Sequence, residues 1–195
     1  MKRPRRGRRP LPRRLGGAVA FVLMLVLLLA GAREAGWLMP ASGRFTAVDG
    51  DSLRRDGQDY RLHAIDAPEL DQHCKRATGE DYACGREARQ ALRGLTEART
   101  LDCRILETDR YGRLVAECLA GDLSINREMV RMGWALAYRR HSRQHAEAES
   151  QAREARRGLW QGRFERPESW RQRHRQQARP LRSGMDPAGE PADDD

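Results

Sequence analysis

The order of strand-like and helix-like segments predicts a small α+β domain with a curled sheet. Strand patterns come first, at 44–48, 53–55 and 58–65, with a tight Asp56-Gly57 turn before the third. A helix, a hairpin and two further helices follow them. A five-stranded OB-fold β-barrel with about three α-helices fits this strand count and the interposed helix. The order of elements alone also fits other α+β folds.

Three segments carry helical patterns. Apolar residues recur at helical spacing in 85–99, which we predict as the first helix. The second and third helices are predicted at 124–132 and 145–157, each followed directly by a glycine, the usual C-terminal stop. A hairpin at 101–119 separates the first helix from the second.

Most of the basic excess lies at the N-terminus. The chain has 195 residues and a formal net charge of +9. Residues 1–32 contain no acid and eight basic residues, without which basic and acidic residues nearly balance: Lys2, Arg3, Arg5, Arg6, Arg8, Arg9, Arg13 and Arg14. The charged side chains of the tail from Ser183 onward are all acidic. The body between these ends is moderately basic, which favours an anionic ligand without identifying one.

The first 32 residues have the layout of a secretory signal. A basic block precedes an uncharged run from Leu15 to Ala32, which ends in the small residues Ala30-Gly31-Ala32. The run is also long enough to be an uncleaved membrane anchor. Either alternative carries the rest of the chain across a membrane, so we expect a periplasmic or secreted protein, or an anchored one whose folded domain lies outside.

Four cysteines in an exported chain are disulfide candidates. Cys103 and Cys118 flank the predicted hairpin and fall opposite each other, and Cys74 and Cys84 close a polar loop. We favour these two pairs among the three connectivities, each stabilising the fold by about 2–4 kcal/mol. Zinc is the competing interpretation, but the chain has no C-x-x-C, and the H-x-x-x-H spacing at 141–145 lacks the adjacent Glu of zinc proteases.

Charged residues concentrate at three predicted strand ends: DGDS at 49–52, RLHAIDAPE at 61–69 and DRYGR at 109–113. Each segment in isolation is most often structural, as a turn, a strand exit or a hairpin turn followed by a solvated arginine. Their joint occurrence, in this order on a chain of this size, favours a functional site.

The chemistry of these groups suits attack of water on a phosphodiester. Clustered carboxylate oxygens, as on Asp51 and Asp66, are ligands that Ca²⁺ accepts with loose geometry. Glu69 follows a rigid proline, and its carboxylate can orient and deprotonate a water. Arg61 and Arg113 offer planar forks that match phosphate oxygens and stabilise charge growing on phosphorus.

Over 43–160 the chain resembles the thermonuclease (staphylococcal nuclease-like) family. VDGDS, YRLHAIDAPE and DRYGR carry the resemblance, and INREMVRMGWA and GLW corroborate it. The resemblance implies an OB-fold core and Ca²⁺-dependent cleavage of DNA and RNA, with 5′-hydroxyl and 3′-phosphate products. Two departures stand out: Ala67 replaces the family's common threonine, and the loop 71–84 is not rich in lysine.

The resemblance also implies a role for each matching residue around one calcium ion. It implies metal ligation by Asp51, Asp66 and the backbone carbonyl of Ala67; catalysis by Arg61, Glu69 and Arg113; substrate binding by Tyr111 and Tyr138; and support of the metal carboxylates by Asp49. DNA and RNA are the expected substrates. We expect a monomer and no protein partner.

Four segments make up the expected organisation. Residues 1–32 form a signal peptide or an N-terminal membrane anchor, 33–42 a linker, and 43–160 the staphylococcal nuclease-like OB-fold domain. The charged C-terminal extension, 161–195, is expected to be largely disordered.

The leading hypothesis is an exported, calcium-dependent endonuclease. The alternative is a non-catalytic OB-fold module that binds nucleic acid or protein, and the intact Arg61, Glu69 and Arg113 argue against it. A third hypothesis is a membrane-anchored interaction protein that relies on its charged ends.

Overall fold

A computed structural model of the chain describes residues 13–34, 40–138 and 144–177. Helix α1 (Arg13–Glu34) covers most of the predicted signal or anchor segment. Within the described ranges, no helix is both long and apolar enough to cross a membrane.

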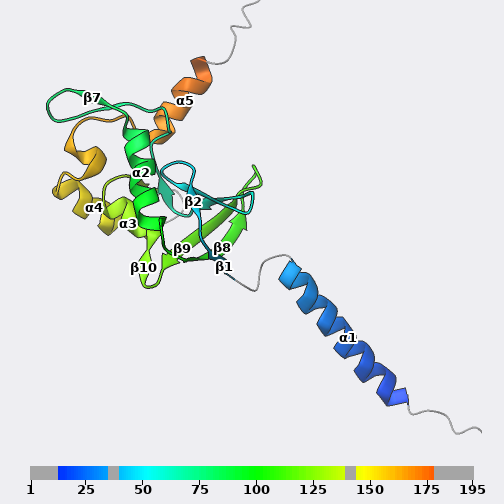
Figure 1. Ribbon diagram of the computed structural model, residues 1–195. Coiled ribbons are helices and arrows are strands. Elements are labelled where there is room, and N and C mark those ends of the chain that lie inside the picture. The colour runs from blue at the N-terminus through cyan, green and yellow to red at the C-terminus, as the bar shows by residue number, and fades with distance from the viewer. Residues whose placement is uncertain (1–12, 35–39, 139–143, 178–195) are drawn as a thin grey trace, which may run out of the picture.

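One curled, mixed sheet frames the domain (Figure 1). Its strands follow the spatial order β1-β8-β9-β4-β3-β2, and β10 pairs with β9. Strands β4 and β9 run parallel, and the other pairs of this sheet are antiparallel. The bounds are β1 Ala41–Gly43, β2 Thr46–Ala47, β3 Ser52–Arg55, β4 Gln58–Leu62, β8 Leu101–Thr108, β9 Leu114–Ala120 and β10 Leu123–Ser124. The predicted α+β class with an OB-type sheet is confirmed.

Two short strand pairs lie outside this sheet. Strand β5 (Ile65–Asp66) pairs with β11 (Leu136–Ala137), and β6 (Cys74–Lys75) pairs with β7 (Asp81–Tyr82). The chain reverses between β4 and β5 at Ala64, whose φ of 60° lies in the left-handed region. This reversal returns Asp66 to the neighbourhood of the β2–β3 turn.

Helices gather beside the sheet in Figure 1, and α3 packs against both β9 and α4. Their bounds are α2 Cys84–Thr96, α3 Ile125–Arg131 and α4 Ala146–Glu154, followed by the 3₁₀ turn Gly158–Gln161 and by α5 Pro167–Gln177. The described ranges thus contain five α-helices rather than about three. The two additional helices, α1 and α5, lie outside the predicted nuclease-like domain.

The core lies between the sheet and helices α2 and α3. Leu53 and Leu62 from the sheet pack in one cluster with Leu92 of α2 and Met129 of α3, and each side chain is almost fully buried. Burial of each such side chain contributes about 1.5–3 kcal/mol. The helical spacing of apolar residues in α2 therefore seats one end of that helix under the β2–β3 turn, where the charged residues gather.

Both disulfides have the favoured connectivity. Cys103 and Cys118 are register partners on β8 and β9, and their bond crosses the hairpin. Cys74 and Cys84 close the loop that contains β6 and β7 and end it at the start of α2.

The first part of the C-terminal extension has regular structure up to residue 177. Lys75 and Arg163 exchange two backbone hydrogen bonds of 2.8 and 2.9 Å, and the buried Gln72 amide donates to the Glu165 carbonyl at 2.8 Å. Helix α5 then begins at Pro167, a residue favoured in the first helical turn. The sequence beyond residue 177 lies outside the described residues.

Candidate active site

The β2–β3 turn places the first two acids. The Asp49 carboxylate accepts a hydrogen bond from the Asp51 backbone N–H at 2.9 Å, which closes the turn. A Cβ on Gly50 would lie 2.7 Å from the Ala67 Cβ and 2.9 Å from the Ala88 Cβ. Glycine therefore lets α2 and the segment after β5 approach the turn closely. Asp51 is left buried, with 4% of its surface exposed.

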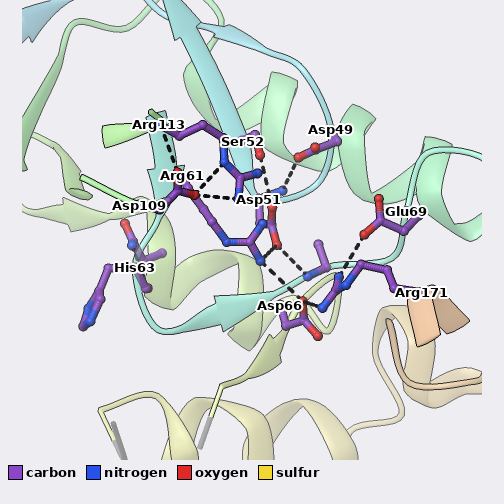
Figure 2. A network of polar contacts seen from close by, with 12 residues as sticks. Asp49, Asp51, Ser52, Arg61, His63, Asp66, Glu69, Asp109, Arg113 and Arg171 are labelled. Carbon is purple, nitrogen blue, oxygen red and sulfur yellow. Dashed lines mark hydrogen bonds and ion pairs between the residues drawn. The ribbon is translucent and has the colours of Figure 1, made fainter. Parts of the chain in front are cut away.

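Asp51 and Asp66 share one guanidinium nitrogen. Arg61 Nη2 donates to Asp51 Oδ2 at 3.1 Å and to Asp66 Oδ1 at 3.5 Å (Figure 2). The Ala67 backbone N–H also donates to Asp51 Oδ2, at 3.1 Å. Arg61 reaches both acids because it is the register partner of Ser52 across β3 and β4. The two predicted metal carboxylates thus converge on one positively charged group.

Burial and repulsion from Asp51 disfavour the ionised forms of Asp49 and Asp66, and a bound cation would offset both effects. Burial raises the pKa of Asp66 to about 6, and the adjacent Asp51 adds to this effect, although Arg171 and Arg61 oppose it. Burial and Asp51 likewise raise the pKa of Asp49 to about 6. The attraction of Asp51, in turn, raises the pKa of Arg61.

Backbone contacts fix the position of Glu69, and its side chain is partly exposed. Its carbonyl accepts from the Gln72 N–H at 2.8 Å. A Cβ on Gly85 would lie 1.8 Å from the same carbonyl oxygen, so the start of α2 packs directly against this turn. The Glu69 side chain remains 34% exposed and lines the cleft described below. Its carboxylate is accessible to a water, as a general base requires.

The tip of the β8–β9 hairpin positions the second predicted arginine. Asp109 Oδ2 accepts from Arg113 Nε at 2.8 Å, and Asp109 Oδ1 accepts from the backbone N–H groups of Tyr111 and Arg113 at 2.9 and 3.0 Å. The Tyr111 ring is 66% exposed and lies 5.5 Å from the Arg113 guanidinium carbon. Asp109 thus orients Arg113, a role that the sequence did not assign to it.

A cleft of about 610 Å³ joins most of these groups. Its lining residues are Asp49, Asp51, Asp59, Arg61, Ala67, Pro68, Glu69, Arg110, Tyr111, Arg113, Arg171 and Arg175. Tyr138 does not line this cleft but a neighbouring one of about 460 Å³, which shares the predicted residues Arg61 and Arg113, and also Arg171, with the first.

Arg171 of α5 is the principal residue that sequence reasoning missed. Its Nη1 donates to Glu69 Oε1 and its Nη2 to Asp66 Oδ1, both at 2.8 Å (Figure 2). Although burial disfavours the charge, these contacts on balance raise the pKa of Arg171. A signal was present, because Pro167-Glu168 is a favourable helix start and Arg171 and Arg175 fall at i, i+4 on the helix that follows.

The predicted metal ligands form a partial site. Among the described residues, no group of three or more His, Cys, Asp or Glu side chains is arranged to hold a metal. Asp51 and Asp66 nevertheless supply two buried carboxylates that a single cationic nitrogen already bridges. This donor set fits Ca²⁺, whose remaining ligands are often carbonyls and waters.

Residues 59–162 match the family model described as staphylococcal nuclease homologue. The match covers more than half of the chain and includes Arg61, Asp66, Glu69 and Arg113. The chain belongs to this family.

Curated relatives extend the comparison. The chain is 37% identical over 134 residues to the succinoglycan biosynthesis protein ExoI of Rhizobium meliloti (strain 1021), covering 67% of this chain and 70% of the relative. It is 33% identical over 141 residues to an uncharacterized endonuclease of Escherichia coli, covering 68% and 85%. Identity to the probable endonuclease LCL3 of Schizophyllum commune (strain H4-8 / FGSC 9210) is 29% over 163 residues, covering 73% and 54%.

Proposed function

We propose that the protein is an exported, calcium-dependent nuclease that hydrolyses phosphodiester bonds of DNA and RNA and leaves 5′-hydroxyl and 3′-phosphate ends. The observation that carries the proposal is the meeting of Arg61, Arg113 and Glu69 in one cleft, beside the buried Asp51 and Asp66. Membership of the staphylococcal nuclease homologue family and the relatives named as endonucleases support it.

The two arginines would bind the scissile phosphate. Each guanidinium can donate two parallel hydrogen bonds to phosphate oxygens and stabilise the negative charge that grows on them. The Asp109 carboxylate accepts a hydrogen bond from Arg113, and the Asp51 carboxylate accepts one from Arg61. Both forks are therefore oriented before the substrate arrives, which lowers the reorganisation that the reaction requires.

Glu69 would remove a proton from the attacking water. The water oxygen then bonds to phosphorus, the bond from phosphorus to the 5′-oxygen breaks, and that oxygen leaves as a hydroxyl after taking up a proton. Asp51, Asp66 and the Ala67 carbonyl would hold the calcium ion. Calcium at this place would supply positive charge to the phosphate and lower the pKa of the water.

Export is supported by the N-terminal sequence and by the cysteines. A basic block followed by an uncharged run ending in small residues is the layout of a secretory signal. Both cysteine pairs form disulfides, which persist in oxidising compartments. We therefore propose that the folded domain lies in the periplasm or outside the cell.

The test is cleavage of single-stranded DNA and of RNA by the purified protein across a panel of divalent cations, with analysis of the new ends. Calcium should support cleavage and EDTA should abolish it. Glu69→Gln should lower kcat by about 10²–10⁴-fold because it removes the base, without loss of the folded domain. Glu97→Gln, at an exposed site on the end of α2, is the matched control. Undiminished cleavage in EDTA would contradict the mechanism.

A further inference from the structure

Arg171 binds the two carboxylates that the proposed mechanism needs free. Its two terminal nitrogens donate at 2.8 Å to Glu69 Oε1 and to Asp66 Oδ1. Glu69 in this ion pair has one carboxylate oxygen, Oε1, committed to the Arg171 guanidinium. Asp66 in this ion pair has one oxygen committed to two arginines, since Arg61 also contacts Oδ1.

Two sets of contacts, with β6 and with Gln72, fix the segment before α5. The fold therefore sets the position of Arg171. Gly162 lies against β6 so closely that a Cβ there would be 2.0 Å from the Lys75 carbonyl oxygen. Lys75 pairs with Arg163, directly beside the Cys74–Cys84 disulfide. The fully buried Gln72 then fixes the Glu165 carbonyl just before α5. The disulfide-closed loop thus delivers α5 to the cleft.

Because both are positively charged, Arg171 and a divalent cation would compete for the Asp66 carboxylate. The side chain of Asp66 is only 6% exposed, so its carboxylate has little water to share among partners. Arg171 is 26% exposed and lies at the cleft, from which it can leave to solvent without unfolding the core. Binding of a cation to the Asp66 oxygen would repel the guanidinium and break the contact with Glu69 at the same time.

We propose that Arg171 is a gating residue, which competes with the divalent cation for Asp66 and holds Glu69 until the cation displaces it. The gate rests on the proposed function, because it presupposes a cation at Asp51 and Asp66. Without a cation, Arg171 of α5 keeps both Glu69 and Asp66 in ion pairs. Cation binding breaks these ion pairs and frees both carboxylates.

The test is calcium binding by the full chain, measured by isothermal titration calorimetry without substrate. Arg171→Gln should tighten calcium binding about tenfold, because two charge-assisted hydrogen bonds no longer compete. Arg175→Gln removes the same charge from an exposed position lining the same cleft. Arg173→Gln removes it from a position on α5 that pairs with Glu165 instead. Both controls should stay within about twofold of the unmodified chain.

Hydrogen exchange of 167–177 gives a second readout. Saturation of the unmodified chain with calcium should speed exchange in α5, because the ion pairs that hold Arg171 are broken. Arg171→Gln should exchange fast already and respond little to calcium.

Unchanged or weaker calcium binding by Arg171→Gln would overturn the gate, and so would equal effects of Arg171→Gln and Arg175→Gln. Absence of calcium binding in every variant would overturn it too. A tenfold tighter Arg171→Gln that cleaves no nucleic acid with any cation would support the gate and contradict the nuclease proposal, so the two failures are distinguishable.

Discussion

At the scale of single residues, the candidate site contains buried acids that lower the free energy of unfolding. Asp49, Asp51 and Asp66 are close together in space. Burial and the neighbouring Asp51 raise the pKa values of Asp49 and Asp66 to about 6. Such an arrangement costs folding free energy whenever the acids are ionised. It is retained where a cation can be bound, which is typical of functional sites.

Asp49 and Asp66 contribute to the pH dependence of stability with one sign. Their pKa is about 6 in the folded chain against 3.8 for an unperturbed aspartate, so between roughly pH 4 and 6 these two groups bind more protons in the folded state than in the unfolded state. Their contribution to the free energy of unfolding in EDTA should therefore fall as pH rises through this window and level off above it. Acids whose pKa is lowered in the folded chain, such as Asp109 and Glu117, contribute with the opposite sign, so a matched variant is needed to isolate the effect.

Asp66→Asn should remove much of this decrease in the free energy of unfolding. At pH 8 the variant should be more stable than the unmodified chain by about 1–3 kcal/mol, because the buried charge is gone, and near pH 4 the two should be similar. Urea denaturation in EDTA at both pH values measures this. Asp102→Asn, at an exposed position of β8, is the control. Equal destabilisation by Asp66→Asn at pH 4 and pH 8 would contradict the account.

At the scale of elements, the Cys74–Cys84 loop links α2 to the C-terminal helix. The loop ends at the first residue of α2, and its strand β6 pairs with Arg163 on the way to α5. The other disulfide joins β8 to β9, and its two cysteines make no such link to α5. The two bonds therefore stabilise the same fold but different elements of the site.

Removal of the two disulfides should separate these roles. Replacing either pair by serines should lower the free energy of unfolding by about 2–4 kcal/mol, because the unfolded chain is less constrained. Only the Cys74→Ser, Cys84→Ser variant should also speed hydrogen exchange in 167–177 under native conditions. If the Cys103→Ser, Cys118→Ser variant loosens α5 equally, the loop is not what holds that helix.

At the scale of the whole molecule, positive charge is collected where substrate would bind. The cleft is lined by five arginines, contributed by three separated parts of the chain: Arg61, Arg110, Arg113, Arg171 and Arg175. Four acids share that lining, so the field depends on which arginines are already paired. Asp51 and Asp109 hold Arg61 and Arg113, whereas Arg175 is exposed at the rim.

Salt dependence should report the arginines that meet nucleic acid. Affinity for a single-stranded oligonucleotide, measured by fluorescence anisotropy in EDTA, should fall with salt, and Arg175→Gln should reduce the slope of log K against log salt by about 0.7. Arg173→Gln should leave the slope unchanged, because that side chain pairs with Glu165 outside the cleft lining. Identical slopes for all three proteins would show that α5 does not touch the strand.

Local patterns predicted most elements and half of the site. The spacing of Cys103 and Cys118 about a central turn predicted a register that the structure shows. Helical spacing predicted α2, and the acids and arginines at strand ends predicted the lining of one cleft. Tyr138 lies in the neighbouring cleft because it follows β11, which pairs with β5 at Ile65 and Asp66.

The sequence by itself determined the α+β order, favoured the two cysteine pairs that the structure shows, and supplied the residue types for the proposed phosphodiester site, because periodicity and turn chemistry act over a few residues. Only the tertiary structure decided that Arg171 lies on Asp66 and Glu69, 105 and 102 residues before it in the chain. No local pattern encodes such a contact. It depends on how the disulfide-closed loop, Gln72 and Arg163 guide the chain back across the cleft.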